Sequence, residues 1–338
     1  MTSILFFIVI TLLSYLGVWI IRRYAEQRQI LDHPNERSSH SLPTPRGGGL
    51  AIVLGVLGSG AGVWAMGEAE VGHALIYLFC GAVIAYLGWR DDVHSLSTRI
   101  RLAVQGLVAA VSIYGLGYFK VVTIPLFGEL HLGIVGIVIT FLWIVGLTNA
   151  YNFMDGIDGI AGGVAFAGAL GWMMLASNMN NNFVFWIALA IAAGSLGFLG
   201  HNWHPAKIFM GDVASTFLGY TFAVLPLLSA TEGGDALMLG TLLMWTFIMD
   251  AGVTFIRRAL RREKLLAAHR THLYQRLVIG GYKHSTVSLL YILLTLLAGI
   301  LSYAWSWGRP YAPPLIILGL PLIWILLARH VSRLKNVN

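Results

Sequence analysis

Long runs of apolar residues alternate with short polar segments along the whole chain. A helix needs about 20 apolar residues to cross a bilayer, and runs close to that length recur eleven times. Because backbone groups in lipid must be hydrogen-bonded within their own segment, each run is expected to be an α-helix. The pattern predicts an all-α, polytopic membrane protein with a single domain over residues 1–338. The runs lie near residues 3–21, 48–66, 71–89, 102–119, 133–149, 159–177, 183–200, 213–230, 236–256, 286–304 and 312–328.

Basic residues are concentrated in alternate polar segments. One set of segments contains 20 of the 22 Lys and Arg residues. The positive-inside rule predicts that this set faces the cytoplasm, with the N-terminus outside and the C-terminus inside. The unusual polar motifs fall in the same set, so we expect the active face there. These segments are 22–47, 90–101, 150–158, 201–212 and 257–285, together with the C-terminal tail.

Composition supports a membrane protein and narrows the function. Hydrophobic residues make up 57% of the chain and charged residues 11%, whereas a soluble domain is about a quarter charged. The net charge of +7 arises from the cytoplasmic segments, where it sets topology and favours anionic lipid or phosphate. It therefore does not indicate nucleic-acid binding. The single cysteine, Cys80, leaves no internal disulfide.

The segment 149–163, N-A-Y-N-F-M-D-G-I-D-G-I-A-G-G, lies between two apolar runs. Carboxylates are costly near a membrane, so Asp155 and Asp158 are functional candidates. If the segment is helical, their spacing of three places both on one face. The glycines keep the backbone bare, which allows a polar ligand to approach closely. The alternative is an ordinary loop of turn residues.

Two further motifs contribute carboxylates. Asp91 and Asp92 end the predicted span 71–89, where the negative end of the helix dipole disfavours them. A metal ion or neighbouring cations such as Arg90, Arg99 and Arg101 must offset that cost. The alternative is the start of a solvated loop. Asp212 ends the segment H-N-W-H-P-A-K-I-F-M-G-D. It caps the next helix, binds a metal ion, or does both.

Two cytoplasmic segments look suited to anions. Arg46 precedes the glycine triplet Gly47–Gly49, which is either a phosphate-binding entry to a helix or a flexible connector. In the last segment, His269 and His272 flank Arg270. A structural zinc site is not expected there, because no cysteine or second histidine pair is nearby. The segment either binds an anionic substrate or is simply a basic loop.

Together these residues favour phosphoryl chemistry with a hard metal ion. Carboxylate and amide oxygens, including those of Asn149 and Asn152, suit Mg²⁺ or Mn²⁺. Mg²⁺ fills its remaining positions with phosphate and water, and Lys207 is a further cation for phosphate. No P-loop or dinucleotide-binding fingerprint is present. The alternatives are a transporter or lipid flippase, which would place ionisable groups at the membrane midplane, and an inactive assembly partner.

The motifs, in this order, resemble the polyprenyl-phosphate N-acetylhexosamine-1-phosphate transferases of glycosyltransferase family 4, the MraY/WecA-like superfamily. The resemblance rests on D-H-P-N-E-R-S-S-H-S-L-P-T-P-R-G-G-G, the Asp91–Asp92 pair, N-x-x-N-x-x-D-G-x-D-G, F-M-G-D and H-R-T-H. It implies a Mg²⁺-dependent enzyme of the bacterial inner membrane. Undecaprenyl phosphate would attack a UDP-N-acetylamino sugar, and UMP would leave.

The resemblance also implies roles for individual residues. Asp212 matches the magnesium ligand, and Asn152 is a second candidate. Asp91 and Asp92 match aspartates assigned to the lipid phosphate or to catalysis. Asp155 and Asp158 match the nucleotide and metal pocket and are counted with the catalytic residues. The expected substrate-binding residues are Asn149, Lys207, His269, Arg270, His272 and Arg46.

Two departures bear on the branch of the family. Ser95 stands where the motif D-D-x-x-D has its last aspartate. H-R-T-H replaces the three adjacent histidines of the peptidoglycan-precursor branch, so the chain is more similar to the branch that initiates O-antigen and related polysaccharides. The peptidoglycan-precursor branch remains the alternative. The sequence does not identify the sugar among GlcNAc, QuiNAc and FucNAc. It leaves the oligomeric state open, with a homodimer as one option.

Overall fold

The computed structural model describes residues 2–32, 42–229, 235–263 and 269–334. Each predicted apolar run contains helix, so the prediction of an all-α, polytopic membrane protein is confirmed. Eight helices are long and apolar enough to cross a bilayer. They are α1 (Thr2–Arg28), α3 (Val71–His94), α4 (Thr98–Leu116), α5 (Val135–Met154), α6 (Ile160–Asn178), α7 (Asn182–Asn202), α12 (His284–Ser306) and the last helix, Ala312–Ser332.

Two predicted spans form apolar helices that are shorter than these eight, α2 (Leu50–Ala65) and α8 (Asp212–Leu228). The last of the eight helices is composite, with α13 (Ala312–Pro314), a π-helical turn (Leu315–Gly319) and α14 (Leu320–Ser332) in succession. The count of eleven crossings and the orientation of the termini stay predictions.

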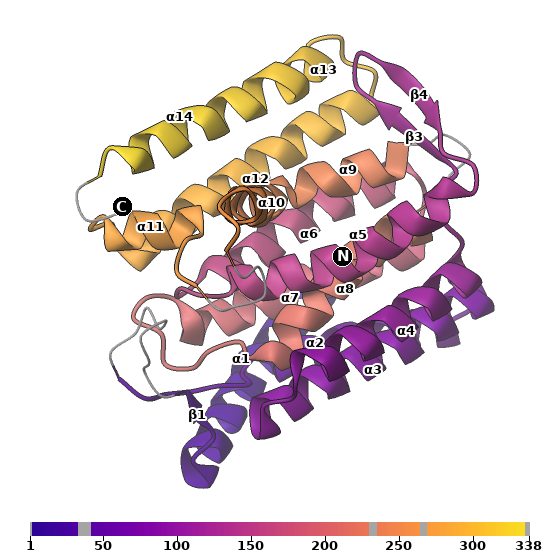
Figure 1. Cartoon of the computed structure of the whole chain (residues 1–338). Coiled ribbons are helices and arrows are strands. Elements are labelled where there is room, and N and C mark those ends of the chain that lie inside the picture. Colours follow the sequence, from indigo (N-terminus) through magenta and orange to yellow (C-terminus); the bar gives the residue numbers. More distant parts are fainter. Residues whose placement is uncertain (1, 33–41, 230–234, 264–268, 335–338) are drawn as a thin grey trace.

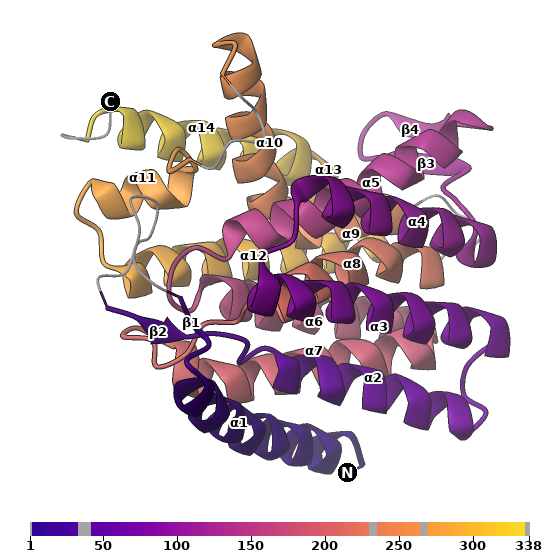
Figure 2. The same cartoon turned by 60° about the horizontal axis from the view of Figure 1, so that its bottom comes forward.

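The prediction of one continuous helix over 236–256 is wrong. The segment forms α9 (Asp235–Leu243) and α10 (Trp245–Leu260), which are bent by 82°, and α10 stands away from the bundle (Figure 2). The Trp245 indole donates to the Leu294 carbonyl of α12 at 3.1 Å, which fixes the start of α10. The bend also lets Asp250 of α10 meet donors from a neighbouring helix, whereas an unsatisfied carboxylate in lipid would be costly.

The best-buried part of the molecule is formed by α6, α7 and α8. In α8 every residue from Val213 to Leu228 is buried. Small residues permit this close packing, as in other membrane helix pairs. A Cβ atom on Gly219 of α8 would lie 2.8 Å from the Thr148 Cα atom of α5. By contrast, α1 is largely exposed and is expected to face lipid.

The axes of most helices are aligned, with neighbouring helices running up and down the bundle, so the molecule has two ends (Figure 1). One end carries the two-stranded sheet of β1 (Leu31–Asp32) and β2 (Thr44–Pro45) together with α11 (Leu273–Ile279). The other carries an antiparallel hairpin of β3 (Val121–Ile124) and β4 (Gly128–His131). The end with β1 and α11 is called the motif end here, because the polar motifs gather there. Neither small sheet was expected from the apolar pattern.

Candidate active site

Asp92 joins the end of α3 to the beginning of α8. Its two carboxylate oxygens accept hydrogen bonds from the backbone N–H groups of Asp212 and Val213, both at 3.0 Å. Those groups have no partner within α8, whose N-cap residue Gly211 offers no side chain. Asp92 therefore caps α8, and the positive end of that helix dipole offsets its unfavourable place at the end of α3. The interpretation of Asp212 as the cap is wrong.

Asp91 is held by an arginine from the next helix. One carboxylate oxygen accepts from the Leu96 N–H at 2.6 Å, and the other accepts from Arg101 of α4 at 2.7 Å. Arg101 also lies 3.4 Å from the Asp212 carboxylate. The Arg46 guanidinium donates to the Asp92 backbone carbonyl. Of the three arginines expected to offset the charge of the paired aspartates, Arg101 is the one that binds a carboxylate of the pair. Arg46, which was expected to bind substrate, adds a second cation beside Asp92.

Asp212 is the most accessible carboxylate of this group. Its side chain is 31% exposed, compared with 8% for Asp91. One oxygen accepts from the Asn152 amide at 2.8 Å, and that amide also donates to the Ser215 hydroxyl. The second oxygen lies 3.4 Å from Arg101, and the Asp212 side chain is also within hydrogen-bonding distance of the Asp91 carboxyl group. Asp91, Asp92 and Asp212, with Arg46, Arg101 and Asn152, are called the carboxylate cluster below.

The carboxylate cluster fits a magnesium ion. Three carboxylates face two guanidinium groups, which leaves an excess of negative charge. Oxygen donors are the ligands that Mg²⁺ prefers, and it needs only one or two carboxylates. Asp212 has a carboxylate oxygen available for this. Asn152 directs its amide nitrogen at Asp212 and so orients that carboxylate; its service as a direct ligand stays a prediction.

Asp155 and Asp158 lie in the loop between α5 and α6, so the prediction that both share a helical face is wrong. Helix α5 ends at Met154 and α6 begins at Ile160. Gly159, the residue immediately before α6, has φ of 79°, a left-handed conformation that glycine adopts without strain and that interrupts a continuous helix. The turn-residue alternative is therefore correct for the backbone, although both carboxylates have well-defined surroundings.

Asp155 is a half-buried carboxyl group surrounded by other acids. Burial is the largest cause that raises its pKa, to about 7, and the negative charges of Asp92 and Asp158 raise it further. Its carboxylate has no hydrogen-bond partner among the described residues. A carboxyl group with this pKa exchanges a proton near neutral pH, which suits acid–base chemistry.

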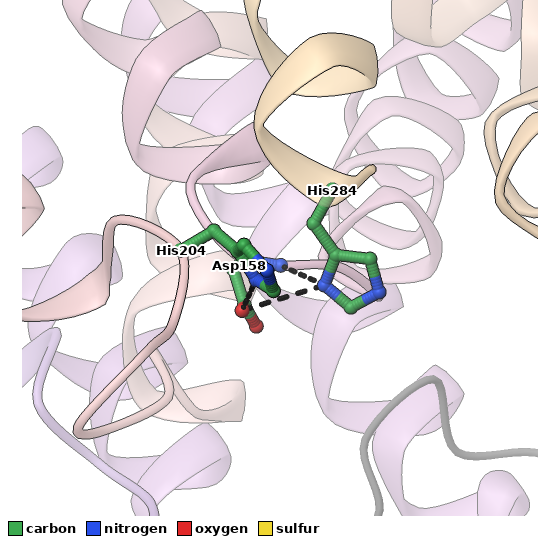
Figure 3. Close-up of side chains that lie close together, drawn as sticks. All are labelled: Asp158, His204 and His284. Atoms are coloured by element: carbon green, nitrogen blue, oxygen red, sulfur yellow. Dashed lines mark hydrogen bonds and ion pairs between the residues drawn. The ribbon is translucent and has the colours of Figure 1, made fainter. Parts of the chain in front are cut away.

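Asp158 is enclosed by two histidines from distant segments (Figure 3). Its Oδ2 atom lies 2.6 Å from Nδ1 of His204 and 3.4 Å from Nδ1 of His284, and it also accepts from the Ala206 N–H at 3.2 Å. Burial raises the pKa of Asp158, but the hydrogen bonds from His284 and His204 outweigh it and leave the pKa below its ordinary value. These three residues are called the imidazole cluster.

Sequence reasoning missed both histidines of the imidazole cluster. His204 lies within the motif H-N-W-H-P-A-K, and its polar side chain there was a usable signal. His284 is the first residue of α12 and gives no local signal. Only the tertiary structure brings it to Asp158, which is 126 residues away in the chain.

The H-R-T-H segment is positioned by Asp250. This buried carboxylate accepts from the Leu273 and Tyr274 N–H groups at 2.7 and 3.0 Å, and it lies 3.2 Å from Nδ1 of His272. It also accepts from the Tyr291 hydroxyl at 2.6 Å. Asp250 thus caps α11, a role that its position in an apolar run did not indicate.

His269 and Arg270 lie beside this anchor. Burial is the main cause that lowers the pKa of His269 to about 4, and electrostatic repulsion from the neighbouring basic groups lowers it further. His269 is therefore neutral at pH 7. Arg270 is half-buried. The Tyr274 hydroxyl donates to the Phe153 carbonyl at 3.1 Å, which connects this segment with the end of α5.

The other expected residues have mixed surroundings. Asn149 donates to Gln105 of α4 at 2.6 Å, so it links two helices. Lys207 is exposed.

The glycine triplet is paired with the segment before α8. The N–H groups of Gly48 and Gly49 donate to the carbonyls of residues 209 and 210, both at 3.0 Å. That pairing supports a packing role for the glycine triplet rather than a phosphate-binding loop. The part of the first motif in residues 33–41 lies outside the described residues.

Fold and site together define a helical, polytopic membrane protein. Its motif end carries carboxylates that fit a cation and, beside them, several basic side chains. The chain belongs to glycosyl transferase family 4, whose family model matches residues 74–230. That range includes all of the carboxylate cluster except Arg46.

Curated relatives extend the similarity over nearly the full chain. A probable undecaprenyl-phosphate N-acetylglucosaminyl 1-phosphate transferase of Bacillus subtilis is 32% identical over 97% of this chain and 92% of its own length. An undecaprenyl-phosphate alpha-N-acetylglucosaminyl 1-phosphate transferase of Escherichia coli is 29% identical, over 87% and 80%. A decaprenyl-phosphate N-acetylglucosaminephosphotransferase of Mycobacterium leprae is 30% identical, over 82% and 77%.

Proposed function

We propose that this protein transfers an N-acetylamino-sugar 1-phosphate from a UDP-sugar to undecaprenyl phosphate and releases UMP. The observation that carries the proposal is the accessible carboxylate of Asp212, oriented by Asn152 and flanked by Arg101 at one end of a membrane helix bundle. The names of the relatives supply the acceptor lipid and the sugar phosphate. UDP-N-acetylglucosamine is therefore the first donor to test.

The proposed reaction needs positioning more than a strong base. A phosphate monoester has its second pKa near 6, so the lipid phosphate is largely ionised at neutral pH. Arg46 and Arg101 would draw this phosphate toward the carboxylate cluster. Asp91 and Asp92 already accept hydrogen bonds, so they act by holding Arg101 and the start of α8. Asp155, with a pKa of about 7, would accept the remaining proton of a monoprotonated lipid phosphate.

Magnesium would be held chiefly by Asp212, and when bound it would neutralise negative charge on the sugar diphosphate. Mn²⁺ would suit the same oxygen donors. Lys207, Arg270 and His272 are proposed to bind the phosphates of the donor, with His269 as a neutral hydrogen-bonding group beside them. Asp158 lies in the loop that follows Asp155, where it is proposed to shape the nucleotide pocket.

The proposal extends to the pathway and the compartment. The H-R-T-H motif supports the branch that initiates O-antigen or a related surface polysaccharide. The basic segments support an active face on the cytoplasmic side of the bacterial inner membrane. A homodimer stays a prediction.

The test is UMP release by the purified protein with undecaprenyl phosphate, Mg²⁺ and a panel of UDP-N-acetylamino sugars. Release should require both lipid and metal. Asp212→Asn should abolish it, whereas Glu129→Gln on the exposed strand β4 should not, because Glu129 lies at the opposite end of the molecule. Full release by the Asp212→Asn variant would contradict the proposed metal site. Absence of release with every sugar, from folded protein, would favour a transporter or an inactive partner.

A further inference from the structure

The imidazole cluster has the composition of a transition-metal site. One nitrogen from each of His204 and His284 and one Asp158 oxygen all lie within 4.8 Å of one another. Two imidazoles and one carboxylate are a donor set that suits Zn²⁺ and related ions better than Mg²⁺. Figure 3 shows both rings directed at the same carboxylate.

The contact between Asp158 and His284 is poorly explained by hydrogen bonding alone. Nδ1 of His284 lies 3.5 Å from the Asp158 backbone nitrogen and 3.4 Å from the Asp158 Oδ2 atom. Both distances exceed the range of about 2.7–3.2 Å that is usual for such hydrogen bonds. A cation bound by Nδ1 and Oδ2 together would hold the two groups at this spacing. A spacing of about 3.4 Å is also what two ligands have around a tetrahedral ion at bond lengths of about 2.0–2.2 Å.

The surroundings hold the ligands in place and leave a path for the ion. The Ser288 hydroxyl donates to the Asp158 carbonyl at 2.7 Å, and the Ala206 N–H donates to the carboxylate. Such supporting contacts are typical of metal ligands. The side chains of Asp158 and His284 are 9% and 11% exposed, but that of His204 is 38% exposed. An ion can therefore enter past His204.

We infer that Asp158, His204 and His284 form a zinc-class metal site, separate from the magnesium site at Asp212. Binding would replace the proton that joins His204 to Asp158 at 2.6 Å, and the two ligand atoms would separate by under about 1 Å to reach the tetrahedral spacing. The ion would tie the loop after α5, the loop after α7 and the start of α12 together. The inference does not depend on the proposed transferase activity.

The experiment measures metal directly. Purified protein is stripped with a chelator, returned to buffer with excess Mg²⁺, and titrated with Co²⁺ and then Zn²⁺. Wild-type protein should bind about one ion per chain, with the visible absorption of tetrahedral Co²⁺ that Zn²⁺ abolishes. Zn²⁺ should also raise the unfolding temperature, because it binds only the folded state. Wild-type protein that retains no Zn²⁺ would overturn the inference.

Matched variants identify the ligands. His204→Asn and His284→Asn each keep a polar side chain but should weaken Zn²⁺ binding by about 100-fold or more. His131→Asn, on a side chain that is 76% exposed, should bind like wild type, and so should Asp212→Asn. Equal Zn²⁺ retention by His204→Asn and His131→Asn would overturn the assignment. If His284→Asn does not fold, the exposed position His204 decides the question alone.

Discussion

At the scale of single residues, aspartates of this protein perform different tasks that their chemistry alone does not separate. The carboxylate oxygens of Asp92 and Asp250 accept hydrogen bonds from the N–H groups at the start of α8 and α11. Asp212 keeps an oxygen available and is partly exposed. The number of hydrogen-bond donors around each carboxylate therefore separates a structural role from metal binding.

These different roles predict that Asp212→Asn mainly lowers activity, whereas Asp92→Asn lowers stability. Asp212→Asn should lower turnover by about 100-fold or more, because the metal ligand is lost, and should leave the unfolding temperature nearly unchanged. Asp92→Asn should lower the free energy of unfolding by about 1–3 kcal/mol, because the cap of α8 is lost. UMP release and thermal unfolding measure both. A more stable Asp92→Asn variant would refute the capping role.

The raised pKa of Asp155 predicts a pH dependence of stability. The folded protein holds this proton up to about pH 7, whereas an unfolded chain loses it near the ordinary value of 3.8. The folded state therefore binds more protons between these values, and stability falls as pH rises through that window. Asp155→Asn should remove this decline. Parallel unfolding curves for both proteins from pH 5 to 8 would show that the pKa is not raised.

At the scale of secondary-structure elements, the site depends on how closely α3 and α8 approach. A Cβ atom on Gly88 of α3 would overlap the backbone of Asp212. Backbone cannot move aside as a flexible side chain can, so the two helices meet at this glycine. The approach brings the end of α3, with its two aspartates, to the first turn of α8.

Gly88→Ala should therefore separate α3 from α8 and impair the carboxylate cluster. We expect a loss of turnover of about 10-fold or more, because misplacement of about 1 Å can cost 100-fold, and a lower unfolding temperature. Gly146→Ala in α5 is the control, since no atom lies within 4 Å of the added Cβ, and it should preserve activity. Normal UMP release from Gly88→Ala would show that the close approach is not needed.

The contact between α10, α11 and α12 supports a second prediction at this scale. Asp250→Asn weakens every hydrogen bond to the carboxylate, whereas Tyr291→Phe removes one of them. A hydrogen bond to a charged group contributes about 1.5–3 kcal/mol. Asp250→Asn should therefore destabilise the protein more than Tyr291→Phe and should raise the KM for the UDP-sugar. Equal, small effects of both changes on stability and KM would contradict the anchoring role.

At the scale of the whole molecule, the fold collects motifs from the full length of the chain at one end. The hairpin of β3 and β4 marks the opposite end (Figure 1). The charge bias predicts that the motif end is cytoplasmic. Introduced cysteines can test this orientation, because the single native cysteine, Cys80, is buried and is replaced in the labelling background.

In a Cys80→Ser background, one cysteine is introduced at each end of the molecule, Glu129→Cys on β4 and Arg261→Cys directly after α10. Their labelling shows on which side of the membrane each end lies. A membrane-impermeant maleimide should label Glu129→Cys on intact cells and Arg261→Cys only after permeabilisation. Both positions are exposed, so labelling reports sidedness rather than burial. The reverse pattern would contradict the predicted orientation.

The sequence by itself determined the helical membrane class and the positions of the apolar segments, and it named Asp91, Asp92 and Asp212 as candidates for the site. These features follow from local properties, namely apolar run length and the cost of charge near lipid. Only the tertiary structure decided that Asp92 caps α8, that Asp250 caps α11, and that the span around Met244 is bent. It alone brought His204 and His284 to Asp158. Each of these results depends on donors supplied by segments distant in the chain, which no local pattern specifies.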